Sequence, residues 1–329
     1  MPRHASVSQL RSLLRDRDAL RDRGWSDRAI RAGITDGTLH RLRRGIFMDA
    51  GEWSQLWPES RHLAEVVAAA SVMSSPHAAM ARESAGVLWG LPLYRMQPST
   101  VQVVVDATVR INSGVRVTRH VARLPDADVT TRHGIVCTTL DRTVFDIART
   151  ATPEAAIACA DAALGIIAVR KRVQDEHEAE LWRERMLGRI DSAGGARGVS
   201  QARRIVEFAD GRAELPGESV SRLQLARLGF QRTRTQVPVP APGGGTYWID
   251  FGLEDADAFG EFDGTDKYLD EAMRSGKTVE EIVLAEKRRE DWIRGTTGRR
   301  VVRWSSEHIG SPEALAARLR AFSISPLPS

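Results

Sequence analysis

The chain has 329 residues, 42% of them hydrophobic and 27% charged, an ordinary globular composition that excludes wholesale disorder. The two cysteines, Cys137 and Cys159, are too few for a disulfide framework or a zinc site of four thiolates. The N-terminus lacks the pattern of a secretory signal, and the longest apolar stretch, around residues 63–73, is too short to span a bilayer. We therefore expect a cytoplasmic protein of about two domains with no membrane partner.

The formal net charge of +4 permits an anionic partner without requiring one. Only four of the 47 basic residues are lysines, and Lys267, Lys277 and Lys287 lie close together in the sequence. An arginine excess of this kind is typical of a GC-rich genome. The clustered lysines are therefore the more informative cations, since a compact ammonium differs in chemistry from a guanidinium fork.

The first part of the chain has the pattern of a small DNA-binding module. Residues 7–23 have apolar side chains at helical spacing, and Ser26 is a good N-cap for a short helix that ends near Gly33. Residues 38–48 predict a β-hairpin around Gly45. Helix, helix and basic hairpin together outline a winged helix-turn-helix, which we assign to residues 1–60.

Residues 61–194 are predicted to form a mixed α/β extension. Its elements are expected to be helix over 61–95 with a new start at Ser75–His77, strands at 101–106, 115–120 and 134–139, and helix again over 139–190. Glycines at 194, 195 and 198 mark a boundary near 195. Whether this extension is a separate domain stays open.

Residues 195–329 predict an α/β domain, so the fold class of the whole chain is α/β (α+β). The expected order is helix at 199–208, helix from Pro216 to Gly229, strands at 231–239, 246–253 and 259–264, helix at 279–294 and strand at 299–305. This order predicts a central mixed sheet flanked by helices.

Four acids of this domain are candidates for a catalytic centre. Alternation along a strand places Glu261 and Asp263 on one face, Asp250 ends the preceding strand, and Glu218 belongs to the helix before. Converging carboxylates repel one another unless a divalent cation neutralises them, and hard oxygen ligands suit Mg²⁺ or Mn²⁺. Asp250 and Glu261 are the predicted metal ligands. With Lys267, or else Lys287, these acids would suit metal-assisted hydrolysis of a phosphodiester.

The same residues also have purely structural interpretations. Asp250 and Glu261 could be edge charges of a sheet, and Asp263 could accept a hydrogen bond from its own turn. An acid such as Glu218 is favoured at a helix N-terminus by the dipole alone, and Lys287 could lie on a solvated helix face. The side chains expected in the core rather than as platforms for nucleic-acid bases are Trp248, Trp292 and Trp304.

The order Glu218, Asp250, Glu261-x-Asp263-Gly264 resembles the PD-(D/E)XK nuclease superfamily in its very-short-patch-repair-like branch. The pairs Gly229-Phe230 and Asp250-Phe251 fit that pattern, as do the basic helix EKRREDWIR and the final strand VVRW. The resemblance implies a restriction-endonuclease-like domain. The superfamily's usual lysine, two residues after the second acid, is Asp263 here, so an active enzyme needs a substitute, for which Lys267 is the first candidate.

The N-terminal half resembles AbiEi-type antitoxins, which are winged-helix transcriptional regulators. The resemblance lies in the hairpin LRRGIF, the helix before it, and the segments HAAMARESAGVLWGLPL and CTTLDRTVFDIAR. It implies that the partners are DNA and a cognate toxin. The predicted DNA contacts are Arg28 and Arg31 on the helix, Arg41, Arg43 and Arg44 on the hairpin, and Lys287 and Arg288 in the C-terminal domain. Alternatively, the N-terminal arginines form a solvated cluster.

Two functional hypotheses follow. One is a DNA-binding protein with a Mg²⁺-dependent endonuclease domain. The other is a non-enzymatic regulator of the AbiEi antitoxin type, whose nuclease fold is inactive. Asp263 in place of lysine favours the second, and the retained pair Asp250 and Glu261 with nearby Lys267 favours the first.

Overall fold

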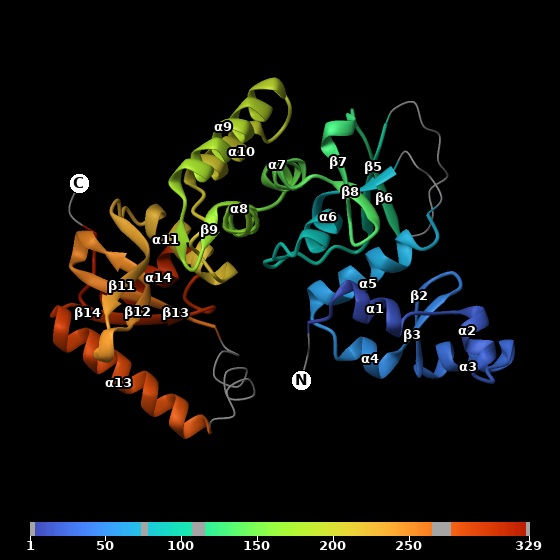
Figure 1. Cartoon of the computed structure of the whole chain (residues 1–329), viewed down its shortest axis with the longest axis horizontal. Coiled ribbons are helices and arrows are strands. Elements are labelled where there is room, and N and C mark those ends of the chain that lie inside the picture. The colour runs from blue at the N-terminus through green and yellow to red at the C-terminus, as the bar shows by residue number, and fades with distance from the viewer. Residues whose placement is uncertain (1–3, 74–77, 107–115, 265–277, 327–329) are drawn as a thin grey trace. The chain divides into compact units, whose positions relative to one another are not determined.

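The computed structural model describes residues 4–73, 78–106, 116–264 and 278–326 (Figure 1). Helices and mixed sheets confirm the α+β class. The chain divides into two compact units, residues 1–151 with 193–202, and residues 152–192 with 203–329. The second unit therefore starts before the expected boundary near 195. Its first helix, α8 (Pro153–Ala168), packs on α11 (Pro216–Arg227), and buried Asp161 pairs with Arg222 across this contact.

The first unit begins with three helices and a three-stranded sheet that contains the predicted hairpin. These elements are α1 (Val7–Leu13), β1 (Arg15–Asp16), α2 (Arg17–Asp22), α3 (Asp27–Asp36), β2 (Leu39–Arg43) and β3 (Ile46–Asp49), with strand order β1-β3-β2. The single helix predicted over 7–23 is wrong, because Asp16 ends a short strand and caps α2 by accepting a hydrogen bond from the Ala19 backbone. Ser26 caps α3 as predicted, but that helix continues past Gly33 and ends at Gly37, which adopts a φ of 79°.

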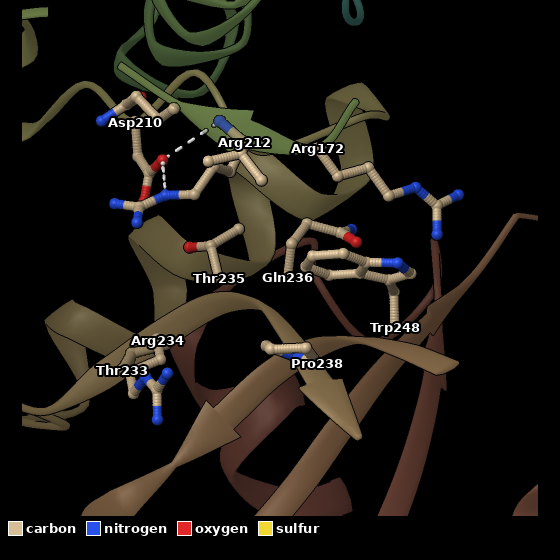
Figure 2. Close-up of a pocket in the computed structure, with 11 residues that line it drawn as sticks. Arg172, Asp210, Arg212, Thr233, Arg234, Thr235, Gln236, Pro238 and Trp248 are labelled. Carbon is tan, nitrogen blue, oxygen red and sulfur yellow. Dashed lines mark hydrogen bonds and ion pairs between the residues drawn. The ribbon is translucent and has the colours of Figure 1, made fainter. Parts of the chain in front are cut away.

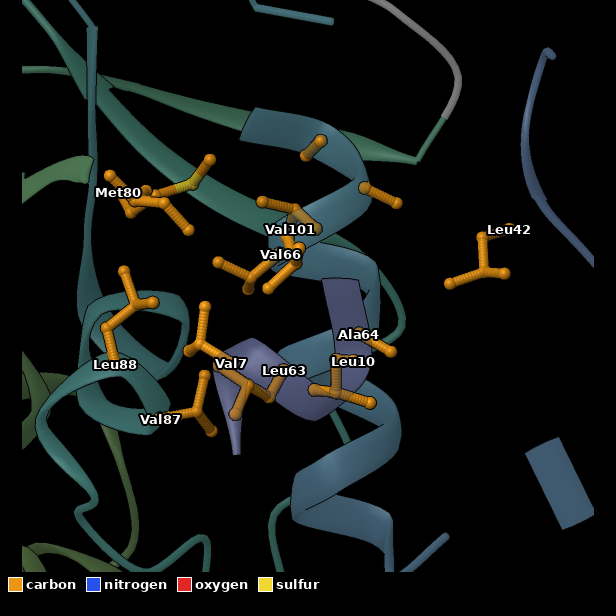
Figure 3. Packing of buried hydrophobic residues seen from close by; sticks show 14 of the residues in the cluster. Val7, Leu10, Leu42, Leu63, Ala64, Val66, Met80, Val87, Leu88 and Val101 are labelled. Carbon is orange, nitrogen blue, oxygen red and sulfur yellow. The ribbon is translucent and has the colours of Figure 1, made fainter. Parts of the chain in front are cut away.

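The rest of the first unit contains a five-stranded sheet of order β6-β5-β4-β8-β7. Its elements are α4 (Ala50–Ser54), α5 (Pro58–Ala70), β4 (Ala78–Met80), α6 (Arg82–Trp89), β5 (Val101–Val105), β6 (Val117–Val121), β7 (Val129–Arg132), β8 (Ile135–Thr138) and α7 (Leu140–Thr150). Strand β4 interrupts the region predicted as helix, and β7 was not expected. The predicted cap at Ser75–His77 lies outside the described residues. Figure 3 shows Leu10 of α1, Leu63 of α5 and Leu88 of α6 in one buried apolar cluster.

The second unit has the predicted order of elements in its C-terminal part. After α8 come β9 (Val169–Arg170), β10 (Val173–Gln174) and α9 (Glu176–Ser192), then α10 (Val199–Phe208), α11, β11 (Thr233–Pro240), β12 (Thr246–Leu253), β13 (Ala258–Asp263), α13 (Val279–Thr297), β14 (Arg300–Ser305) and α14 (Pro312–Arg320). The hairpin of β9 and β10 interrupts the helix predicted over 139–190. Among the described residues, none of the helices combines the length and apolar character needed to cross a membrane.

The sheet of the second unit runs β11-β12-β13-β14, antiparallel except for the parallel pair β13 and β14 that α13 connects. On one face, the Phe262 ring lies against Gly217 of α11, and a Cβ added to that glycine would come within 2.1 Å of the ring. On the other face, Phe259 packs with Ile293 of α13. The sheet therefore lies between α11 and α13. Asp250 was predicted to end its strand but lies in the middle of β12, which continues to Leu253.

Candidate functional site

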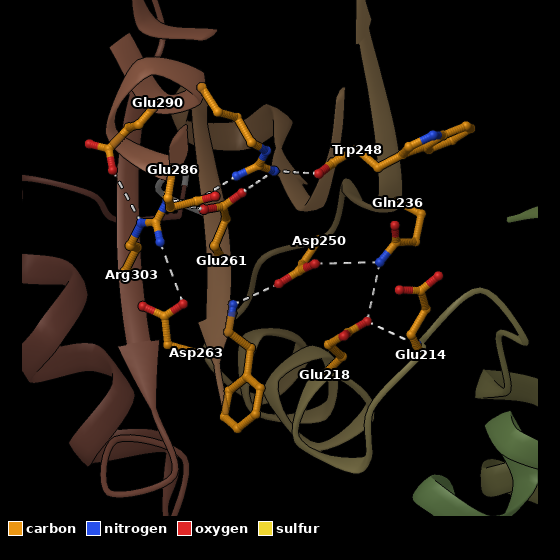
Figure 4. Close-up of polar contacts among 12 residues, drawn as sticks. Glu214, Glu218, Gln236, Trp248, Asp250, Glu261, Asp263, Glu286, Glu290 and Arg303 are labelled. Atoms are coloured by element: carbon orange, nitrogen blue, oxygen red, sulfur yellow. Dashed lines mark hydrogen bonds and ion pairs between the residues drawn. The ribbon is translucent and has the colours of Figure 1, made fainter. Parts of the chain in front are cut away.

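Four predicted acids lie in one unit, where α11, β12 and β13 meet (Figure 4). Glu218 is in the first turn of α11, which begins at Pro216 because a proline there loses no hydrogen bond. Asp250 lies in β12, and both Glu261 and Asp263 lie in β13. The acids divide into two groups with different partners.

Glu218 and Asp250 form the first group and are linked through Gln236. The Gln236 Nε2 group donates to Glu218 Oε2 at 3.3 Å and to Asp250 Oδ1 at 3.4 Å. The backbone N–H groups of Glu214 and Phe262 donate to Glu218 Oε2 at 2.9 Å and Asp250 Oδ2 at 2.8 Å. Glu218 is only 3% exposed, and burial, together with the charge of Asp250, raises its pKa to about 8. At neutral pH the Glu218 carboxyl is therefore mostly protonated.

Glu261 belongs to the second group, in which arginines neutralise the acids. Its Oε1 accepts from Arg289 Nη2 at 2.6 Å, and its Oε2 lies 2.8 Å from Arg303 Nη2. Arg289 comes from α13, whereas Arg303 is the register partner of Glu261 on β14. Sequence reasoning placed Glu261 beside Asp250 as a metal ligand, but both of its oxygens are occupied by guanidinium groups.

Asp263 joins the same cluster through Arg303. The Asp263 Oδ1 atom lies 3.5 Å from Arg303 Nη1, and Arg303 also contacts Glu286 and Glu290 of α13. Burial lowers the pKa of Arg303, but the charges of Glu261 and Glu286 more than offset this and raise it. This cluster is an ion-pair network of two arginines and four acids that fastens α13 to the edge of the sheet.

Three cations were predicted for this unit, and the structure describes two of them. Lys267 is outside the described residues. Lys287 and Arg288 are exposed on α13, whereas their neighbour Arg289 points to Glu261. Arg289, Arg303 and Gln236 were therefore missed as site residues. Arg289 and Arg303 lie in the segments EKRREDWIR and VVRW. In a chain with so many arginines, the sequence does not show that these two face the acids.

The Glu218 and Asp250 pair is the better carboxylate pair for a divalent cation. Mg²⁺ is commonly held by one or two carboxylates together with water and phosphate oxygens, so this small donor set fits it. Among the residues that the structure describes, no group of three or more His, Cys, Asp or Glu side chains is arranged to hold a metal ion. Any ion here would therefore depend on substrate or water for its remaining ligands.

The predicted N-terminal DNA contacts differ in exposure. Arg28 and Arg31 are exposed on α3, and Arg41 and Arg44 are exposed on the hairpin of β2 and β3. Arg43 is instead half-buried and its Nη2 donates to the Arg116 carbonyl at 3.4 Å. Burial lowers the pKa of Arg43, as expected for a side chain directed into the protein. The exposed arginines of this set are thus Arg28, Arg31, Arg41 and Arg44, which we call the basic surface of the first unit. Arg43 is not part of it.

Comparison with known proteins gives limited similarity. No family model matches the chain. Two curated proteins of Mycobacterium tuberculosis are similar to it: uncharacterized protein MT2308 of strain CDC 1551 / Oshkosh, and uncharacterized protein Rv2248 of strain ATCC 25618 / H37Rv. Each is 27% identical over 248 residues, which cover 68% of this chain and 81% of the relative. The chain is thus similar to these mycobacterial proteins over most of their length.

Proposed function

We propose that this protein binds DNA through its first unit and hydrolyses phosphodiesters with a Mg²⁺- or Mn²⁺-dependent centre in its second unit. One observation carries the proposal: Gln236 links the buried Glu218 side chain to Asp250 through hydrogen bonds. Glu218 lies at the start of α11 and Asp250 lies in β12. Two carboxyl groups are held close together there, although both lose solvation and repel when ionised. Such an arrangement is costly for stability and suits a cation.

In this proposal, Asp250 and Glu218 hold the ion, and Glu218 gives up its proton when it does so. A bound divalent cation would polarise a phosphoryl oxygen and lower the pKa of a bound water. Gln236 keeps the two carboxyl groups in position through its amide. Lys267 keeps its predicted role of orienting the attacking water or the scissile phosphate. Glu261 forms structural ion pairs with Arg289 and Arg303, so it is not a metal ligand in this proposal.

The DNA-binding part of the proposal rests on the exposed arginines of α3 and the hairpin. A winged helix places its recognition helix, here α3, in the major groove and its hairpin against the backbone or minor groove. Arg28 and Arg31 would then approach base edges, and Arg41 and Arg44 the phosphates. The resemblance to winged-helix regulators gives the same expectation.

Titration calorimetry with Mn²⁺ at low ionic strength tests the centre directly. We expect binding by the wild type, and a loss of about tenfold or more in affinity in both Glu218→Gln and Asp250→Asn, because each removes an anionic oxygen ligand. Glu313→Gln is the matched control, since Glu313 also follows a proline in the first turn of a helix but is exposed. Unchanged Mn²⁺ affinity in both centre variants would refute the metal site.

A second candidate function is favoured by the arginines around Glu261. If the centre binds no metal and the protein cuts neither duplex nor single-stranded DNA, a non-enzymatic regulator of the AbiEi antitoxin type accounts better for the chain. Its partners would be operator DNA and a cognate toxin. Sequence-specific duplex binding with no Mn²⁺ binding would support this function, and Mn²⁺-dependent cleavage lost in Asp250→Asn would exclude it.

A further inference from the structure

A pocket of about 340 Å³ lies in the second unit beside the carboxylate pair (Figure 2). Arg172 from the β9–β10 turn and Arg212 after α10 line one side, and Arg234, Thr235 and Gln236 of β11 with Trp248 of β12 line the other. The lining thus combines cations, an indole and polar groups, which is unusual for a packing defect.

The cations of the pocket exceed its acids. Arg212 Nε forms an ion pair with Asp210 Oδ1 at 2.8 Å. Burial alone would raise the pKa of Asp210, but the hydrogen bond and charge of Arg212 lower it. Arg172 pairs with Glu214, and both side chains are 43% exposed, while Arg234 is 62% exposed and lies 3.8 Å from Glu254. Exposed ion pairs like these contribute little to stability, so an incoming phosphate can replace the carboxylates.

Two hydroxyl groups in the pocket wall, those of Thr233 and Thr235, have no hydrogen-bond partner among the described residues. The Thr235 side chain is only 6% exposed, and its hydroxyl makes no hydrogen bond among the described residues. A buried hydroxyl without a partner is unfavourable, and a ligand with a donor or acceptor would satisfy it.

Gln236 joins the pocket to the carboxylate pair. It lines the pocket and its Nε2 donates to Glu218 and Asp250, and its φ of 52° is a left-handed conformation in the middle of a strand. Strained backbone of this kind persists where the surroundings over-determine it and is found preferentially at functional sites. A ligand in the pocket would therefore lie next to the proposed metal centre.

We propose that this pocket binds one nucleotide of a nucleic-acid strand, with the base on the Trp248 indole and the phosphate near Arg172, whose side chain lies beside that indole in Figure 2. Stacking on an aromatic ring and a guanidinium-bound phosphate are the two recurring contacts of single-stranded nucleic acid with proteins. Thr235 offers its hydroxyl to a polar edge of the base or to the sugar. The inference rests on the proposed function, since it assigns the substrate's docking position at that centre.

A mononucleotide is the suitable probe. A longer strand would also bind to the arginines of the first unit through its successive phosphates, and this would obscure binding in the pocket. Calorimetry with the full-length protein would compare a deoxynucleoside 5′-monophosphate with the corresponding nucleoside and with inorganic phosphate, without metal. We expect the nucleotide to bind most tightly. Trp248→Ala should weaken nucleotide binding by about tenfold or more through lost stacking. Arg172→Gln should weaken binding of the nucleotide but not of the nucleoside, since only the nucleotide carries the phosphate.

Matched variants separate binding from general damage. Trp292→Ala removes another tryptophan of this unit that is 40% exposed, and Arg232→Gln removes an exposed, ion-paired arginine outside the pocket. Both should bind as the wild type does. Thr235→Val keeps the shape of the side chain, so it should fold normally while nucleotide affinity falls.

Three outcomes would overturn the inference: no nucleotide binding, equal binding of inorganic phosphate and nucleotide, or unchanged affinity in all three pocket variants. The Mn²⁺ titration distinguishes this failure from failure of the proposed function. Mn²⁺ binding without nucleotide binding removes only the pocket. Nucleotide binding without Mn²⁺ binding keeps the pocket and removes the metal centre.

Discussion

His62 of α5 is a buried base in the first unit, and it links stability to pH. It is 5% exposed, and its Nε2 lies 2.9 Å from the Ser84 hydroxyl, which also accepts from the Gln102 backbone. Burial lowers the pKa of His62 from 6.5 to about 4. Between these values the unfolded chain binds more protons than the folded one, so the stability that the neutral imidazole contributes is lost as the pH falls.

His62→Gln therefore has a predictable effect. The wild type should lose stability between pH 6.5 and about 4 more steeply than His62→Gln, which has no titrating group there. Thermal unfolding midpoints measured across this range provide the test. His133→Gln, which replaces an exposed histidine of the same unit, should keep the wild-type slope. Parallel slopes for wild type and His62→Gln would show that this imidazole is not the linked group.

The acids of the site could be identified from sequence, but their partners could not. Strand alternation and helix starts placed Glu218, Asp250 and Glu261 in one region, as the structure has them. The contacts of Glu261 depend on the parallel register of β13 with β14, which brings Arg303 opposite it. Hydrophobic alternation determines which face a residue takes but not which residue lies opposite it on a distant strand.

At the scale of elements, Gly217 of α11 and Gly260 of β13 allow α11 and the sheet to approach closely. A Cβ on Gly260 of β13 would lie 2.2 Å from the Trp304 ring, and Trp304 in turn donates its indole N–H to the Ser221 hydroxyl of α11. Phe251 stacks on the same indole with a centroid distance of 5.4 Å. The buried ring cannot move aside because it is held by both contacts.

Gly260→Ala should therefore destabilise the second unit by about 1–3 kcal/mol through overpacking. Gly295→Ala is the control, because nothing lies within 4 Å of its added Cβ and it belongs to α13. Alanine there should stabilise by about 0.5–1 kcal/mol through helix propensity. Denaturant unfolding of both variants measures the difference. Equal stability of Gly260→Ala and wild type would mean that the indole can shift.

Long periodic elements were predicted well and short ones were not. The helices α11 and α13 and the strands β11 to β14 have the expected order, because each carries several apolar residues at one period. The strands β1, β9 and β10 have two residues each, too few to show alternation. Strand β4 is apolar throughout, and its sequence predicts helix, because a short buried run has no periodicity that separates strand from helix.

At the scale of the whole molecule, the basic charge is unevenly placed. The first fifty residues contain eleven arginines and six aspartates. Several of these aspartates are neutralised locally, such as Asp27, which contacts both Arg17 and Arg21. The arginines of α3 and the hairpin therefore contribute much of the exposed positive charge of this region. Binding to a polyanion should depend on them, independently of any chemistry in the second unit.

The salt dependence of duplex binding measures how many of these arginines contact phosphates. Each phosphate contact adds about 0.9 to the slope of log affinity against log salt concentration, because counterions are released. Replacing Arg41 and Arg44 together with glutamine should lower that slope by about 1–2. Arg43→Gln is the control within the same hairpin, since its guanidinium faces the Arg116 carbonyl and should leave the slope unchanged. An unchanged slope in the double variant would assign these arginines to a solvated surface and place any DNA contact elsewhere.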